Sequence, residues 1–148
     1  MSYITNSSAT QNEVLEGGRL ITILNGNLVI NNCQFYNNFI YYDTEGIFGV
    51  GANLTIIGCN FQQNQYAQYY TRLANPYLGD VNGDWVSLGT NSTMWIYNST
   101  FNKGRGVYGG CINIQGTSQS MIFNTTFISC SALLGGGIYA VNFDSLVV

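Results

Sequence analysis

Phenylalanine recurs in this chain at a fixed interval, and that interval is the strongest constraint on the fold. Four phenylalanines, each closing a run of apolar and then polar residues, stand at positions 35, 61, 101 and 127, so their successive separations are 26, 40 and 26. The middle separation equals one period of 26 plus an insert of 14. A fixed period in the twenties is typical of a solenoid, in which each repeat forms one coil that buries its apolar face only against neighbouring coils.

A second marker follows the same period. The pair Gly109-Gly110 recurs as Gly135-Gly136, at a separation of 26. The pair Gly17-Gly18 precedes Phe35 by the same distance that separates Gly109-Gly110 from Phe127. Because two independent markers share one period, we expect a single solenoid domain over residues 1–148, with about five coils of period 26 and an insert of length 14 in one coil at about 65–89.

The segments between these markers alternate in polarity as β-strands do. Leu28 and Ile30 point to one side and Val29 to the other, which is the two-residue period of a strand. No long stretch repeats apolar residues at helical spacing, which disfavours helical and leucine-rich repeats. The sequence therefore predicts an all-β parallel β-helix with two internal columns, Phe35, Phe61, Phe101 and Phe127 in one and Ile30, Ile56, Ile96 and Ile122 in the other.

Two short motifs carry a resemblance to a known group of proteins. They are Phe-x-x-Asn and Gly-Gly-x-Ile, or close variants, at Phe35–Asn38, Phe61–Asn64, Gly110–Ile112 and Gly136–Ile138. The chain resembles right-handed parallel β-helix proteins of the pectin-lyase-like kind, and more closely the repeats of polymorphic outer-membrane proteins and related surface adhesins. The resemblance implies a right-handed coil and an extracellular or cell-surface location. It implies little about activity, because β-helices carry several functions.

Five asparagines lie in Asn-x-Ser/Thr sequons, which are acceptor motifs for N-glycosylation: Asn6, Asn53, Asn91, Asn98 and Asn124. Three of them, Asn6, Asn98 and Asn124, lie three residues before a phenylalanine position or its equivalent. One interpretation is a ladder of stacked asparagine amides along the solenoid. The other is glycosylation along one edge of a secreted protein. We expect Asn6, Asn53 and Asn91 to be the better acceptors because they are less committed to such a ladder.

The four cysteines bear on the compartment. Cys33 and Cys59 are also separated by 26, so we expect them in adjacent coils about 4.8 Å apart. A Cys33–Cys59 disulfide and an unbonded pair of small apolar side chains both fit this spacing. Cys111 and Cys130 occupy different registers, and spacing alone does not pair them. Without histidine or a C-x-x-C motif, a zinc site is disfavoured.

Oxygen ligands alternate in the insert, at Asp80, Asn82 and Asp84, as at the start of a calcium loop. The match then fails, because Trp85 stands where such a loop needs glycine and no glutamate follows at the twelfth position. A tight hairpin turn at Asn82-Gly83 is the competing interpretation, and we prefer it. Calcium is the only cofactor that the sequence suggests.

The resemblance to pectin-lyase-like enzymes also raises a catalytic alternative. Such enzymes place acidic groups on one coil face, and the candidates here are Asp43, Glu45, Asp80 and Asp84. A polysaccharide lyase or hydrolase uses paired carboxylates to bind calcium or to act as acid and base. The only nearby basic residues are Arg19 and Arg72. We prefer the interpretation of these acids as ordinary solvated side chains.

Charge excludes some partners. Only four residues are Lys or Arg and the net charge is -3, which argues against a nucleic-acid interface. No run reaches the roughly 18 apolar residues of a membrane span. Residues 1–6 lack the charged start and apolar centre of a signal peptide, so either an export signal has been removed or the sequence is a piece of a longer chain.

Aromatic residues and the chain ends suggest self-association. Six aromatic residues are expected to be exposed and to form a contact surface between subunits, or else to stack on sugar rings: Tyr41, Tyr42, Tyr69, Tyr70, Tyr77 and Trp85. The apolar segments at residues 2–4 and 146–148 share one register, because positions 4 and 148 differ by five periods of 26 plus the insert of 14. We therefore expect a structural, secreted and glycosylated subunit or adhesin segment that stacks head-to-tail. The alternatives are a fragment whose neighbouring coils belong to the same chain, and a capped monomer.

Overall fold

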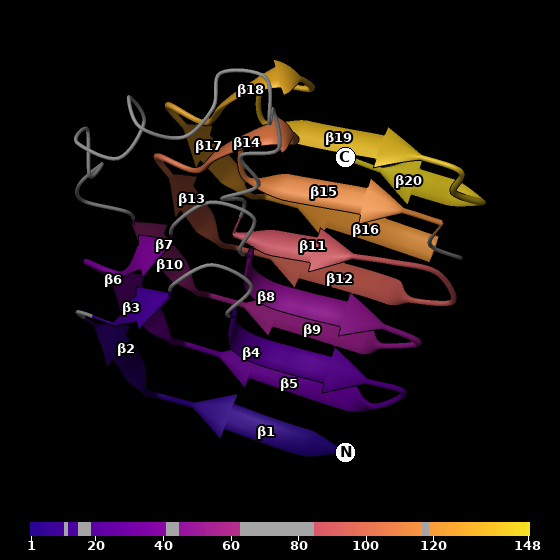
Figure 1. Ribbon diagram of the computed structural model, residues 1–148. Helices are drawn as coiled ribbons and strands as arrows, with labels where there is room; N and C mark the ends of the chain where they lie inside the picture. Colours follow the sequence, from indigo (N-terminus) through magenta and orange to yellow (C-terminus); the bar gives the residue numbers. More distant parts are fainter. Residues whose placement is uncertain (11, 15–18, 41–44, 63–84, 117–118) are drawn as a thin grey trace.

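The computed structural model describes residues 1–10, 12–14, 19–40, 45–62, 85–116 and 119–148, and Figure 1 shows their strands stacked as a parallel β-solenoid. All regular elements in these residues are strands, which confirms the predicted all-β solenoid. The described residues form about four turns rather than the five predicted. The longest sheet still has six strands, but one of the steps between them passes through residues 63–84, outside the described residues.

Successive turns add strands to three parallel sheets. The first sheet contains, in spatial order, β1 (Ser2–Thr5), β5 (Asn27–Asn31), β9 (Asn53–Ile57), β12 (Thr93–Tyr97), β16 (Gln119–Phe123) and β20 (Ser145–Val147). The second contains β2 (Ser8–Thr10), β6 (Gln34–Tyr36), β10 (Asn60–Gln62), β13 (Thr100–Asn102) and β17 (Thr126–Ile128). The third contains β4 (Arg19–Leu24), β8 (Glu45–Val50), β11 (Val86–Leu88), β15 (Ile112–Gln115) and β19 (Ile138–Val141). Two short pairs complete the described coils, β3 (Glu13–Val14) with β7 (Phe39–Ile40) and β14 (Arg105–Tyr108) with β18 (Ser131–Leu134).

The pairing register follows the sequence period with one departure. Strands of neighbouring coils pair positions 26 apart, as Leu28 pairs with Leu54. Across the insert, the first and second sheets pair positions 40 apart, whereas the third sheet pairs Gly49 with Leu88, which are 39 apart. The additional residues are therefore split: 13 precede β11 and one lies in the corner between β11 and β12. Most of the predicted insert at about 65–89 lies outside the described residues.

Both predicted core columns are present. The rings of Phe35, Phe61 and Phe101 stack at 4.6 Å between centroids, with planes within 3° of parallel, and Phe127 follows at 5.5 Å. The isoleucine column is paired in register and buried throughout, at Ile30, Ile56, Ile96 and Ile122. Because strand side chains alternate between faces, a coil of constant period returns the same apolar residue to the interior in every turn.

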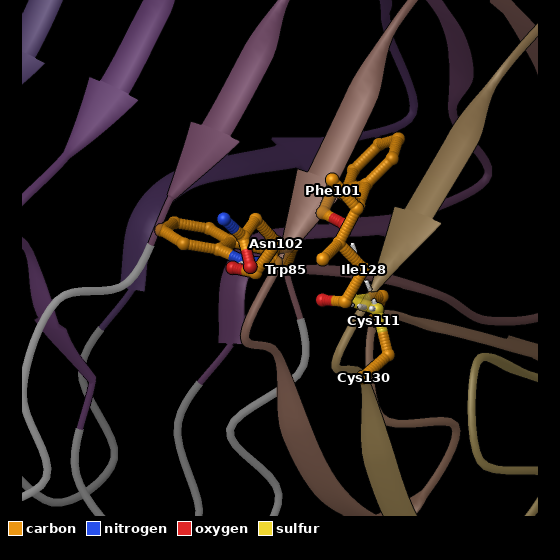
Figure 2. The surroundings of a disulfide bond; sticks show 6 residues. All are labelled: Trp85, Phe101, Asn102, Cys111, Ile128 and Cys130. Atoms are coloured by element: carbon orange, nitrogen blue, oxygen red, sulfur yellow. Dashed lines mark hydrogen bonds between the residues drawn. A yellow bond between two sulfur atoms is a disulfide. The ribbon is translucent and has the colours of Figure 1, made fainter.

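Trp85 corrects another expectation. It was expected on the surface with the tyrosines, but its side chain is 0% exposed. Its ring lies against Phe61 at 5.5 Å, tilted by 57°. Its Nε1–H donates to the carbonyl oxygen of Asn102 at 3.4 Å, and Figure 2 shows the two residues side by side. The indole therefore belongs to the core, with its one donor satisfied.

Candidate functional site

The corner between the first and second sheets positions three of the sequon asparagines. At successive levels of the stack this corner, called here the first corner, is occupied by Asn6, Asn32, Gly58, Asn98 and Asn124, and every one of them has φ between 47° and 60°. Left-handed backbone is costly for most residues and is tolerated by glycine and asparagine. The asparagines at this register are therefore explained by the turn itself.

The residue after the first corner forms a second, internal ladder. At successive levels of the stack it is Ser7, Cys33, Cys59, Ser99 and Thr125, and each donates to the carbonyl oxygen two residues earlier, as Ser99 does to Tyr97 at 2.8 Å. In two of these residues the oxygen or sulfur also accepts from the preceding coil: the Cys33 N–H donates to Cys59 Sγ at 3.4 Å, and the Cys59 N–H donates to Ser99 Oγ at 3.1 Å. The fold therefore selects a small hydroxyl or thiol at the middle position of the sequon.

The third sequon position is different, because it starts a second-sheet strand with an outward side chain. The residues in register there are Ser8, Gln34, Asn60, Thr100 and Thr126, none of which is buried. Glutamine and asparagine serve this position in two coils, so the fold does not require a hydroxyl. The fold thus explains the first and second residues of the sequons at Asn6, Asn98 and Asn124, but it does not explain the serine or threonine at the third position.

The five sequon asparagines are exposed, but their amides are engaged differently. Asn124 Nδ2 donates to Asn98 Oδ1 at 2.8 Å, which is the predicted ladder. Asn53 Nδ2 donates to Asn27 Oδ1 at 2.6 Å and Asn53 Oδ1 accepts from Thr93 at 2.6 Å, so the expectation that Asn53 is less committed to a ladder than Asn98 and Asn124 was wrong. Within the described part of the chain, no side-chain hydrogen bond engages the amide of Asn6 or of Asn91. Glycosylation itself remains a prediction at all five positions.

The cysteines pair in a way that spacing did not reveal. A disulfide joins Cys111 to Cys130, with their Cα atoms 5.6 Å apart (Figure 2), and it links consecutive coils. Gly104 makes room for it, because a Cβ on that glycine would lie 2.6 Å from Cys111 Sγ. Disulfides persist in oxidising compartments.

The predicted Cys33–Cys59 disulfide is wrong, since both thiols are free and buried. Each thiol instead occupies the internal ladder, and Cys59 Sγ accepts from the Cys33 N–H at 3.4 Å. The unbonded stack that the spacing also allowed is the arrangement present. Burial raises the pKa of the Cys59 thiol above its usual range.

Most of the acidic and calcium candidates lie outside the described residues. These are Asp43, Asp80, Asn82 and Asp84, and the tyrosines at 41, 42, 69, 70 and 77 lie there too. Of the acidic set only Glu45 is described, and its Oε2 accepts from Arg19 Nε at 2.8 Å. Arg19 also lies over the ring of Phe48, 3.9 Å from its centroid. Among the described side chains, no group of three His, Cys, Asp or Glu residues is placed to hold a metal ion.

The two ends of the stack present strand edges and partly covered core. Within the described strands, β1 pairs only with β5, and β20 pairs only with β16 (Figure 1). Apolar side chains that are buried in the central coils are only half-buried here, Ile4 and Ile21 at one end and Phe127 and Leu146 at the other. Each end therefore offers both backbone hydrogen bonds and apolar surface to a further coil.

No protein-family model matches this chain, and comparisons with curated proteins and with solved structures give no significant match. No helix that is long and apolar enough to cross a bilayer occurs in the described residues.

Proposed function

We propose that this protein is a secreted structural subunit that stacks head-to-tail through the ends of its β-solenoid into an extracellular filament or surface layer. The observation that carries the proposal is the shared register of β1 and β20. Val147 follows Met121 in the outward column of the first sheet, and Tyr3 precedes Val29 in the same column. A second copy that pairs its β1 with β20 therefore places its Tyr3 beside Val147 of the first copy and continues the register of the first sheet. Among the described strands, the second and third sheets hold five each against six in the first, so each is one strand short at this junction.

The contact would be heterologous, because one end offers the edge of β1 and the other the edge of β20. A heterologous contact that does not close into a ring produces a filament. The half-buried first-sheet side chains at the two ends, Ile4 and Leu146, support the proposal, since a further coil paired through β1 and β20 would bury them as the central coils are buried. A second copy is the proposed source of that coil.

Secretion is supported by two features. The Cys111–Cys130 disulfide fits an oxidising compartment. The sequons at the first corner carry a hydroxyl residue where the same fold accepts glutamine or asparagine. The Phe-x-x-Asn and Gly-Gly-x-Ile motifs, which resemble those of surface adhesins, support the same location.

The test uses charge at the two exposed end positions, Tyr3 (64% exposed) and Val147 (55% exposed). The double variant Tyr3→Lys with Val147→Lys would place like charges side by side in the stack and should abolish filaments. The double variant Tyr3→Lys with Val147→Glu would place opposite charges there and should restore them. Leu24→Lys, at an equally exposed position on the side of the solenoid, is the control.

Electron microscopy and sedimentation velocity of the secreted chain give the readout. The proposal expects filaments for the wild type, for Leu24→Lys and for the Lys/Glu variant, but not for the Lys/Lys variant. Monodisperse particles of about 16 kDa for the wild type at all concentrations would overturn it. Equal filament formation by both double variants would also contradict the proposed contact.

A further inference from the structure

An apolar column lies on the outer face of the first sheet, one residue before the first corner. It consists of Ile57, Tyr97 and Phe123, which are paired in register in three consecutive coils. Phe123 is 65% exposed, and Tyr97 is half-buried. Burial of this column would remove apolar area from water, so a covering group has a physical reason to lie here.

Two sequons begin at the next residues, Asn98 after Tyr97 and Asn124 after Phe123. Their amides are not equivalent. Asn124 uses its Nδ2 to donate to Asn98 Oδ1 at 2.8 Å, whereas no side chain of the described residues accepts from Asn98 Nδ2. The neighbour of Asn98 in the preceding coil is Gly58, which has no side-chain oxygen to accept from Asn98. The nitrogen that would carry a glycan makes no side-chain hydrogen bond to the described residues at Asn98, whereas at Asn124 one of its two hydrogens is donated to Asn98.

We propose that Asn98 is the glycosylated residue of this pair, and that the first sugar of its glycan packs over Tyr97 and Phe123. The inference rests on the proposed secretion of the protein. The attachment forms a bond between Asn98 Nδ2 and the anomeric carbon of an oligosaccharide donated from a lipid diphosphate. The bond from that carbon to the diphosphate oxygen breaks, the lipid diphosphate leaves, and Nδ2 loses one proton.

The chemistry of the surface suits a neutral sugar. The column and its two corner asparagines carry no charged side chain. A pyranose ring has an apolar face of C–H groups that can lie against an aromatic ring, while its hydroxyl edge stays in water. The acetamido group of an N-acetylhexosamine adds a donor and an acceptor beside the Asn98–Asn124 amide pair.

The test removes the glycan without changing the corner. Thr100→Gln destroys the Asn98 sequon but uses the residue that Gln34 supplies at the equivalent position. Ser8→Gln is the matched change for Asn6, which has the same left-handed backbone but follows Thr5 rather than an aromatic residue. Each is made with Phe123 and with Phe123→Thr in a secretory host, and site occupancy and Tm are measured.

The expected result is occupancy at Asn98 and a Tm that falls by about 2–4 °C in Thr100→Gln. In the Phe123→Thr background the same change should lower Tm by much less. The Ser8→Gln change should have an effect that does not depend on Phe123. An endoglycosidase that leaves only the first sugar should preserve the wild-type Tm.

Two outcomes would overturn the inference alone: an unmodified Asn98 with other sequons occupied, or a Tm effect of Thr100→Gln that is independent of Phe123. A secreted chain with every sequon unmodified would overturn this inference and remove the glycan support for secretion. The filament variants at Tyr3 and Val147 report separately on the proposed structural function.

Discussion

At the scale of single residues, the corners decide which side chains the fold accepts. Ten non-glycine residues of the described chain have positive φ, and eight of the ten are asparagines. Asparagine tolerates this backbone because its short polar side chain hydrogen-bonds locally. Asn25 and Gly51 occupy equivalent corners of two coils, with φ of 50° and 59°. The backbone conformation of the corners therefore explains much of the abundance of asparagine without reference to function.

Asn25 offers a direct check of this explanation. Asn25→Ala should lower the free energy of unfolding by about 1–2 kcal/mol, because alanine bears the full cost of left-handed backbone. Asn25→Gly should cost clearly less, since glycine adopts this backbone without strain and already does so at Gly51. Urea denaturation of both variants gives the comparison. Equal losses for alanine and glycine would show that the side-chain amide, and not the backbone, is what the corner requires.

Phe61 tests the aromatic column. It is 0% exposed and contacts rings on both sides, so Phe61→Ala should cost about 3–5 kcal/mol. Phe123→Ala, on the exposed outer face, should change the free energy of unfolding by less than about 0.5 kcal/mol in chain that carries no glycan. Chemical denaturation of unglycosylated protein measures both. Similar losses for the two phenylalanines would contradict the assigned register.

The aromatic column could be predicted from the sequence, whereas Trp85 could not. A strand period of two and a coil period of 26 together place Phe35 and Phe61 inside, and no other information is needed. Trp85 follows directly after the insert, where the third sheet pairs positions 39 apart and the other sheets pair positions 40 apart. A position counted across the insert is therefore displaced by one residue, and in a strand one residue reverses inside and outside.

At the scale of elements, the disulfide connects what the strand ladders leave separate. Cys111 precedes β15 of the third sheet and Cys130 follows β17 of the second sheet in the next coil. Their pairing depends on how the corners fold toward each other, and no fixed sequence spacing encodes that. Cys33 and Cys59 have the regular spacing, but their side chains lie parallel in one ladder and each serves as a donor to its own coil.

Reduction of the Cys111–Cys130 bond should lower the free energy of unfolding by about 3 kcal/mol, because the bond closes a short loop in the unfolded chain. The Cys111→Ala, Cys130→Ala double variant should match the reduced protein. Thiol titration provides a second check. Unfolded, unreduced protein should expose two thiols, those of Cys33 and Cys59, and folded protein should react slowly.

The buried Cys59 thiol should make the free energy of unfolding depend on pH. Its pKa is raised in the folded state by burial, so the folded protein holds the thiol proton more tightly than the unfolded chain does. The contribution of the protonated Cys59 thiol to the free energy of unfolding is therefore fully present below the pKa of the thiol in the unfolded chain. It is lost as the pH rises through the pKa of the thiol in the folded protein. Cys59→Ser, which imitates Ser99 at the equivalent position, should therefore lose less stability than the wild type between neutral and alkaline pH. Parallel stability–pH curves for the two proteins would contradict the assignment.

At the scale of the whole molecule, the described coils at the centre of the solenoid should be the most stable against local unfolding, and those at its two ends the least stable. The central coils bury the columns around Ile56 and Ile96 on both sides, whereas Ile4 and Leu146 are covered on one side only. In a chain of stacked repeats, each coil is stabilised by its nearest neighbours. The end coils therefore open more readily than the middle ones.

Hydrogen exchange measures this gradient. In dilute protein, amides of β1 and β20 should exchange faster than those of β9 and β12, which lie between two paired strands. In the proposed filament, protection of β1 and β20 should rise toward that of the central strands. The Tyr3→Lys, Val147→Lys variant should show no such rise. Uniform protection along the stack of the dispersed wild-type protein would contradict the nearest-neighbour description.

The unequal corners between the third and first sheets bear on how the chain avoids misfolding. The corner between the third and first sheets has two lengths, measured between equivalent positions of the two sheets. It spans four positions in the two coils nearest the N-terminus, as from Gly49 to Asn53, and five in the later coils, as from Leu88 to Thr93. Repeated coils invite a strand to dock one repeat away from its proper place. A coil that slipped across this boundary would set a four-residue corner against a five-residue one, and one of its two sheets would turn its apolar side chains to water. The change in corner length thus distinguishes repeats that are otherwise nearly identical. It makes mispairing of strands across the middle of the stack less favourable than mispairing within either half.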